Sequence, residues 1–213
     1  QRTVQQVIEE IEMIEKKLSP RYIYICDANF MPSIQRRKEW LQLFIHELKK
    51  RKFHAYFSAL LRTNDVIYYE EFIPQLKEIG FTCLYVGIES FVQRQLDFYN
   101  KHTTVEENLR AIDIILKSSM KINFTFLFLD PFTSIKEIRE NLETVKKLYV
   151  YSYITYDQPF FSMTSTVNSI VGTKLHNIIK QNKLELSDDK GYKFVDNEVT
   201  RYYETVREWN YIL

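Results

Sequence analysis

The chain has 213 residues and a mass of 25.8 kDa, and hydrophobic and charged residues make up 45% and 27% of it. This balance is typical of a folded globular domain and excludes a disordered chain. The net charge of +1 gives no indication of nucleic-acid binding, and no apolar run approaches the roughly 18 residues of a membrane span. The first residue is Gln1 rather than Met, so we expect further residues upstream.

Helical periodicity and short apolar runs alternate along the first three quarters of the chain. A helix with Val4, Ile8 and Ile11 on one face is closed by Pro20. Four more helices follow, over residues 36–52, 70–80, 92–119 and 134–148, and the third of these is expected to break near His102. Strands are predicted at residues 22–26, 54–61, 82–88, 122–129 and 149–156.

This alternation predicts an α/β fold with a parallel sheet and outer helices. The chain has only four glycines and no glycine-rich phosphate loop, which favours a barrel or partial barrel over a flat doubly wound sheet. After residue 158 the pattern becomes irregular and then resumes as helices at 173–183 and 196–210. We therefore predict a barrel over residues 1–158, incomplete at its N-terminus, and a C-terminal extension over 159–213 that packs on it.

The two cysteines, Cys26 and Cys83, each stand inside an apolar run and have no metal-type partner two to four residues away. We expect both to be small buried strand residues in a reducing, cytoplasmic compartment. No metal site is predicted from these two cysteines alone.

Polar side chains follow every predicted strand, where ligands bind in parallel α/β folds. Helix capping is an alternative role for Asp27 and Ser90, but Glu89 is a weaker cap and needs a partner at the end of a buried strand. No hydrolytic motif is present, so these residues favour a cofactor site. The polar residues at the strand ends are Asp27, Asn29, Ser58, Arg62, Asp65, Glu89, Ser90, Asp130, Asp157 and Gln158.

Four segments in order carry a family resemblance: IYICDANF at residues 23–30, LRTNDV at 61–66, LYVGIESFVQRQLDFYNKHTTVEEN at 84–108 and INFTFLFLDPFTSIKEIRENL at 122–142. Together they resemble the radical S-adenosylmethionine (SAM) superfamily, in particular the group associated with a cobalamin-binding domain. GTKLHNIIKQNKLE and KFVDNEVTRYYETVRE extend the likeness to about residue 208.

The resemblance implies a partial (β/α)6 barrel of the TIM type, in which a four-iron–four-sulfur cluster binds SAM and one electron cleaves SAM into methionine and a 5′-deoxyadenosyl radical. It implies that Asp27 and Asn29 approach the methionyl amino group. Arg62 would neutralise the SAM carboxylate or pair with Glu89. The remaining residues implied to contact SAM are Glu89, Ser90, Asp130 and Pro131, the last two near the adenine.

The family's Cys-x3-Cys-x2-Cys motif is absent from this chain, which we expect to begin after it and to be inactive by itself. Three hypotheses stay open: a piece of a radical SAM enzyme, a barrel that has lost its cluster and binds a ligand or partner, and an unrelated α/β barrel. The family group allows methyl transfer through cobalamin, and a small-molecule or peptide substrate and an electron donor are implied. The aromatic stretch at residues 149–161 lines a pocket or fills the core.

Overall fold

The computed structural model describes residues 2–31, 37–151, 163–185 and 191–212. They form two compact units, which are treated separately below. The first contains the described residues up to 88 and residues 106–124, and the second contains residues 89–105, 125–151 and those from 163 onward. The predicted boundary between barrel and extension, after residue 158, lies outside the described residues and stays a prediction.

Four strands form a parallel sheet in the order β1-β2-β3-β4. In register, Tyr24 of β1 lies opposite Ser58 of β2, which lies opposite Cys83 of β3. This order confirms the parallel sheet and four of the predicted strands. The strands are β1 (Tyr22–Ile25), β2 (Tyr56–Arg62), β3 (Phe81–Glu89) and β4 (Lys121–Phe126).

The two faces of the sheet differ in polarity. One face carries fully buried apolar side chains, such as Leu61 and Val86, and packs against helices. The opposite face carries exposed tyrosines, and the rings of Tyr24 and Tyr85 meet edge to face with their centroids 5.2 Å apart. The side chains of the sheet are therefore buried and apolar on one face and more exposed on the other. A sheet covered by helices on both faces has continuously apolar strands instead.

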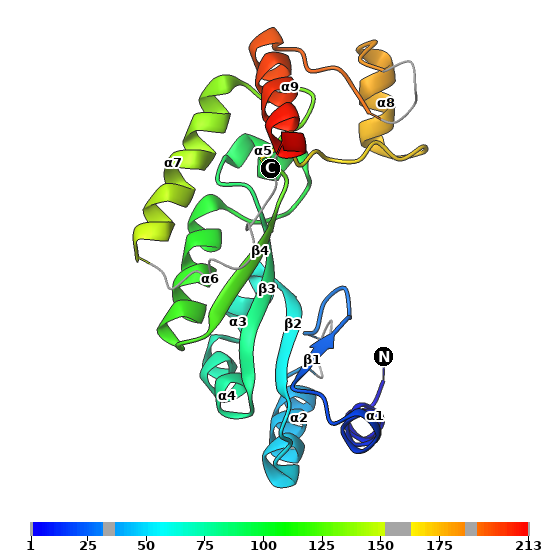
Figure 1. Ribbon diagram of the computed structural model, residues 1–213, viewed down its shortest axis with the longest axis vertical. Coiled ribbons are helices and arrows are strands. Elements are labelled where there is room, and N and C mark those ends of the chain that lie inside the picture. The colour runs from blue at the N-terminus through cyan, green and yellow to red at the C-terminus, as the bar shows by residue number, and fades with distance from the viewer. Residues whose placement is uncertain (1, 32–36, 152–162, 186–190, 213) are drawn as a thin grey trace. The chain divides into compact units, whose positions relative to one another are not determined.

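The helices of the first unit follow the strands as the periodicity predicts. A capping box between Thr3 and Gln6 starts α1, and Ser19 in the left-handed region ends it. In Figure 1, α3, α4 and α6 lie on the same side of the sheet. The bounds are α1 (Val4–Leu18), α2 (Arg37–Arg51), α3 (Thr63–Tyr68), the 3-10 helix η1 (Glu70–Phe72), α4 (Ile73–Glu78) and α6 (Val105–Lys117).

A buried asparagine joins three elements of the first unit. The amide of Asn108, on α6, donates to the carbonyl of Ile88 over 2.9 Å and accepts from the hydroxyl of Thr63 over 2.7 Å. Asn108 is fully buried, so neither the carbonyl nor the hydroxyl has water as a substitute partner. This one side chain therefore fixes the end of β3 and the start of α3 against α6.

The second unit is mainly helical. Its loop after β4 pairs with a later segment, since the backbone N–H of Phe128 donates to the carbonyl of Ser165 over 3.1 Å and Leu129 forms a parallel bridge with Thr166. The helices are α5 (Gln93–Phe98), α7 (Ile135–Tyr151), α8 (Lys174–Gln181) and α9 (Asn197–Ile212). The break predicted near His102 is confirmed, because α5 and α6 are separate helices.

Three predictions of local structure are corrected. Residues 149–151, the start of the predicted fifth strand, continue α7, and residues 152–156 lie outside the described residues. The short helix α3 was not predicted, and β4 ends at Phe126 and not at residue 129. Cys26 follows the end of β1 and is exposed, so the expectation of a buried strand residue is wrong there, while Cys83 is partly buried.

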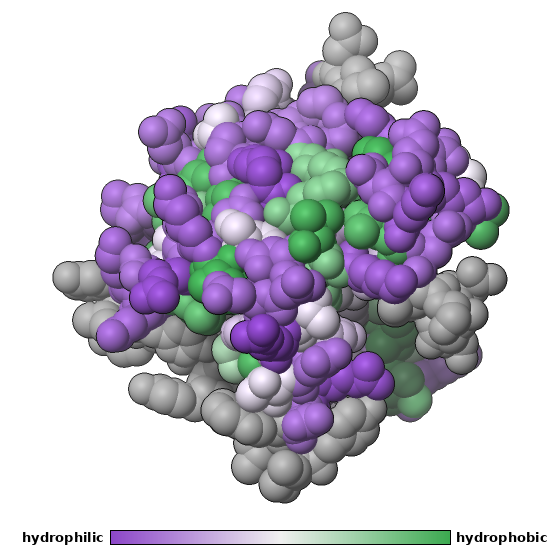
Figure 2. Space-filling model, turned by 90° about the horizontal axis from the view of Figure 1, so that it is seen from above, coloured by the Kyte–Doolittle hydropathy of each residue, from purple (hydrophilic) through white to green (hydrophobic). Residues whose placement is uncertain are grey.

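Hydrophilic residues cover most of the described part of the face shown in Figure 2, and hydrophobic residues lie in separate groups between them. Large exposed apolar side chains, such as Leu18, Tyr68 and Val171, come from distant parts of the sequence. Within the described ranges, no helix is long and apolar enough to cross a membrane.

We predict that Asn108→Ala lowers the free energy of unfolding by about 2–3 kcal/mol, because the Ile88 carbonyl and the Thr63 hydroxyl lose their buried partner. Urea unfolding followed by circular dichroism measures this loss. Lys117→Ala, at the exposed end of the same helix, is the control and leaves the midpoint nearly unchanged. Equal midpoints for wild type and Asn108→Ala would show that the amide does not hold these elements together.

Candidate functional site

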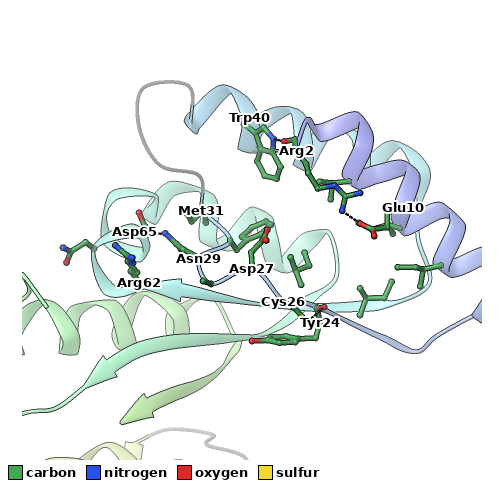
Figure 3. A pocket seen from close by; sticks show the side chains of 18 residues that line it. Arg2, Glu10, Tyr24, Cys26, Asp27, Asn29, Met31, Trp40, Arg62 and Asp65 are labelled. Carbon is green, nitrogen blue, oxygen red and sulfur yellow. Dashed lines mark hydrogen bonds and ion pairs between the residues drawn. The ribbon is translucent and has the colours of Figure 1, made fainter. Parts of the chain in front are cut away.

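A pocket of about 1000 Å³ lies in the first unit, between β1, the loop that follows it, α1, α2 and the start of α3. Figure 3 shows Asn29 and Asp65 joined at one end, with Arg2 and Trp40 on the helical side. The indole N–H of Trp40 donates to the backbone carbonyl of Arg2 over 3.3 Å, which ties α2 to the start of α1. The volume is that of a site for a small molecule or cofactor.

The loop after β1 is anchored on the neighbouring strand. The backbone N–H of Phe30 donates to the carbonyl of Leu60 in β2 over 2.8 Å. The buried ring of Phe30 packs against Trp40, Phe44 and Phe81, with centroids 5.4 to 6.0 Å away. This packing holds the adjacent part of the loop against α2 and the start of β3.

Asn29 occupies a fixed orientation in this loop. Its Nδ2 donates to Oδ2 of Asp65 over 2.7 Å, and Asp65 is only 6% exposed. The other atom of the amide, Oδ1, is buried and has no hydrogen-bond partner among the residues described. Buried acceptors are rarely left unsatisfied, so this oxygen indicates a missing donor.

Two charged side chains complete the pocket. Asp27 is exposed, and no helix starts directly after it, so the capping alternative does not apply: α2 begins at Arg37. Arg62, the residue before α3, is exposed and makes no ion pair within the described part of the chain. The pocket is therefore lined by a carboxylate, an amide and a guanidinium, groups that can bind the amino and carboxylate groups of an amino acid.

Glu89 lies in the second unit, at the end of β3, in a strained backbone conformation. Its φ of 64° is in the left-handed region, which is uncommon for a residue with a side chain. Its carbonyl accepts from the backbone N–H of Leu127 over 2.8 Å, and its carboxylate pairs with Nζ of Lys101 at 2.6 Å. The carboxylate therefore has Lys101 as its partner, in place of the pairing with Arg62 that was one of the expectations.

Ser90 is fully buried and organises the turn into α5. Its hydroxyl accepts from the backbone N–H of Val92 over 2.9 Å and lies 2.6 Å from Oε1 of Gln95. Asn141 of α7 accepts from the N–H of Phe91 over 2.8 Å and donates to Gln95 over 2.9 Å. These bonds give Ser90 a structural role, but it is not the predicted helix cap, because the N-cap of α5 is Val92 and no side chain caps the helix.

Asp130 is fully buried, and protein donors surround its carboxylate. Arg94 binds it through both terminal nitrogens, at 3.2 and 2.9 Å, the hydroxyl of Tyr99 donates over 3.3 Å, and the N–H of Phe132 donates over 2.9 Å. The carbonyl of Pro131 accepts from the N–H of Val195 over 2.9 Å. Asp130 thus holds the turn after β4 and presents no unbonded carboxylate oxygen.

The charges around this turn are strongly coupled. Burial opposes the charge of Arg94, but its hydrogen bonds to Glu137 and Asp130 outweigh burial and raise its pKa. Burial also acts to raise the pKa of Glu137, yet the bonds from Arg94 and Ser134 prevail and lower it below 4.5. Burial raises the pKa of Tyr99, and the Asp130 carboxylate adds to the effect, so the phenol stays a neutral donor.

The described residues do not supply a metal centre. No group of three or more His, Cys, Asp or Glu side chains is placed to hold a metal ion within the ranges described. Burial raises the pKa of the Cys83 thiol to about 11, which disfavours the thiolate that iron requires. Cys26 lines the pocket as a single thiol.

The structure brings Asp27, Asn29 and Arg62 into one pocket. Glu89, Ser90, Asp130 and Pro131 belong to the second unit. Sequence reasoning noted Asp65 at a strand end but assigned it no role, and it missed Lys101 and Arg94. The feature of the sequence that could have indicated Asp65 is its spacing: it follows Arg62 by three residues and lies in the first turn of a helix. Lys101 follows α5, which starts after Glu89.

The sequence model of the Radical SAM superfamily matches residues 1–145, and the chain belongs to this family. The anaerobic magnesium-protoporphyrin IX monomethyl ester cyclase of Rubrivivax gelatinosus is 29% identical over 126 residues, covering 59% of this chain and 22% of that protein. An uncharacterized methyltransferase of Pyrococcus horikoshii is 24% identical over 159 residues, covering 74% and 33%. The chain thus spans at most a third of these curated relatives.

Solved structures share the fold. The cobalamin-dependent SAM radical enzyme OxsB, with aqua-cobalamin and SAM bound, superposes with a TM-score of 0.81 at 16% identity, covering 97% of this chain and 37% of that one. The radical SAM methyltransferase TsrM of Kitasatospora setae gives 0.60 at 17% identity, covering 70% and 29%. The fold class is therefore the α/β partial barrel of the TIM type that was predicted.

Acid is predicted to weaken the second unit through Glu137. Its pKa in the folded state lies below that in the unfolded state, so its stabilisation is complete above pH 4.5 and is lost as pH falls through the folded pKa. The difference in thermal midpoint between wild type and Glu137→Gln should be largest near neutral pH and shrink as the pH falls below 4.5.

The control is Glu140→Gln, which changes an exposed residue of the same helix that makes no ion pair with any described residue. Differential scanning calorimetry across this pH range measures both variants. A midpoint difference for Glu137→Gln that stays constant with pH would contradict the assignment.

Proposed function

We propose that this chain is the SAM-binding core of a radical SAM enzyme that modifies its substrate by radical chemistry. The pocket carries the proposal, because it gathers Asp27, Asn29 and Arg62 around a space of cofactor size in a chain of this family. The unsatisfied Oδ1 of Asn29 would accept from the methionyl amino group of SAM, and Arg62 would bind the carboxylate.

From the family resemblance, Glu89, Ser90, Asp130 and Pro131 of the second unit are also proposed as SAM contacts. Glu89 and Lys101 form a polar pair at a strained strand end, where strain is common at ligand sites. Ser90 would fix the turn beside them, and Asp130 and Pro131 would shape the turn near the adenine through the backbone. A four-iron–four-sulfur cluster, when bound, supplies the electron that breaks the sulfur–carbon bond of SAM, giving methionine and a 5′-deoxyadenosyl radical.

The finer proposal is that the reaction ends in methyl transfer with cobalamin as a second cofactor. Two relatives are described as methyltransferases, and OxsB is described as cobalamin-dependent. The relative from Rubrivivax gelatinosus is named as a cyclase and not as a methyltransferase. The relatives therefore support radical SAM chemistry in general, and they support methyl transfer less strongly.

The function is tested in the protein with its complete natural sequence, purified and reconstituted with iron and sulfide without oxygen. We expect about four irons per chain and release of 5′-deoxyadenosine and methionine from SAM after reduction. Cys26→Ala and Cys83→Ala should keep the same iron content, because neither thiol is grouped with other ligands among the residues described. A protein that binds SAM but holds no iron would favour the ligand-binding barrel over the enzyme.

Glu89→Gln is predicted to weaken SAM binding about tenfold, because a carboxylate that orients polar groups of the ligand becomes a neutral amide. The thermal midpoint should change little, since the side chain retains a hydrogen-bond acceptor for Lys101. Isothermal titration calorimetry measures the affinity, with Glu106→Gln on the exposed start of α6 as control. Unchanged SAM affinity would remove Glu89 from the site.

A further inference from the structure

The amide of Asn29 has two possible orientations, which differ in whether a hydrogen-bond donor or an acceptor faces the pocket. With Nδ2 turned to the pocket the residue donates, and with Oδ1 turned there it accepts. An ionised carboxylate accepts hydrogen bonds and cannot donate them. Because Asp65 receives Nδ2 over 2.7 Å, it holds the amide in one of these orientations, with Oδ1 as the atom left without a described partner.

Asp65 is itself held firmly. It is 6% exposed, it lies in the first turn of α3, and its backbone carbonyl accepts from the N–H of Tyr69 over 2.9 Å. On the other side, the bond between Phe30 and Leu60 fixes the residue next to Asn29 against β2. Both partners of the bond between Asn29 and Asp65 therefore lie on backbone that is held by hydrogen bonds. Figure 3 shows the bond between their side chains.

We infer that Asp65 is a positioning residue that makes Asn29 an acceptor, and so selects ligands that carry an amino group at this end of the pocket. The inference rests on the proposed binding of SAM. Arg62 lies three residues before Asp65 and lines the same pocket with an exposed guanidinium. The pair formed by the Asn29 oxygen and Arg62 is complementary to the amino and carboxylate groups of one amino-acid end.

The variant Asp65→Asn keeps the shape of the side chain but can donate as well as accept, so the orientation of Asn29 is no longer fixed. The test uses the protein with its complete natural sequence and two probes. S-adenosylhomocysteine carries the amino-acid end, and 5′-methylthioadenosine lacks it. We expect Asp65→Asn to bind S-adenosylhomocysteine about tenfold more weakly and to bind 5′-methylthioadenosine as wild type does.

A double-mutant cycle separates positioning from a general structural effect. In the Asn29→Ala background there is no amide to orient, so Asp65→Asn should cause no further loss of S-adenosylhomocysteine affinity. Asp113→Asn, an exposed acid-to-amide change on α6, is the matched control and should leave both affinities unchanged.

The outcomes that overturn the inference are distinct from failure of the proposed function. If Asp65→Asn weakens both probes equally, or weakens S-adenosylhomocysteine in the Asn29→Ala background as well, Asp65 acts on the fold and not through Asn29. If Asp65→Asn leaves both affinities unchanged, Asp65 has no positioning role. If wild type binds neither probe nor SAM, the proposed function is wrong, and the inference falls with it.

Discussion

Two buried asparagine side chains form hydrogen bonds with buried backbone groups close to the end of β3, and these bonds offset the cost of burying those groups. In the first unit, Asn108 reaches from α6 to the carbonyl of Ile88. In the second unit, Asn141 reaches from α7 to the N–H of Phe91. An amide can donate and accept at once, so a single side chain satisfies a backbone group and a neighbouring hydroxyl or amide. The positions of the loops after the strands depend on these two buried residues.

The two units differ in whether the charged and polar side chains named here already have partners within the protein. In the second unit, Arg94 is committed to Asp130 and Glu137, and Lys101 to Glu89. In the first unit, the described contacts leave Arg62 without an ion pair and Oδ1 of Asn29 without a donor. Saturated networks make a site rigid, while groups without protein partners are available to a ligand. Among the described residues named here, the groups still available to a ligand are those of the first unit.

Much of the fold was accessible from sequence because strand and helix periodicities are local. The four strands and most helices have the predicted order, and the break near His102 is present. The aromatic and β-branched run at residues 149–151 was read as strand, yet it extends α7, since tertiary context overrides weak propensity. The exposure of Cys26 was not predictable from an apolar run, because β1 is short and ends one residue earlier.

Within the candidate site, the sequence predicts which polar residues are present, but it does not predict which of them form hydrogen bonds with each other. Asp27, Asn29 and Arg62 stand out as polar residues at strand ends, and the structure places them around one pocket. The role of Asp65 appears only when the loop after β1 is folded onto β2, because the contact joins residues 36 positions apart. Pairings of this kind depend on tertiary geometry, which no local pattern encodes.

The backbone of Glu89 is strained at a residue whose carboxylate is paired with Lys101. Glycine is the residue that adopts this conformation without cost, and its presence there would relieve a strain of about 1 kcal/mol. Glycine at position 89 would also remove the ion pair with Lys101, so the relief of backbone strain is opposed by the loss of a partly buried charge pair.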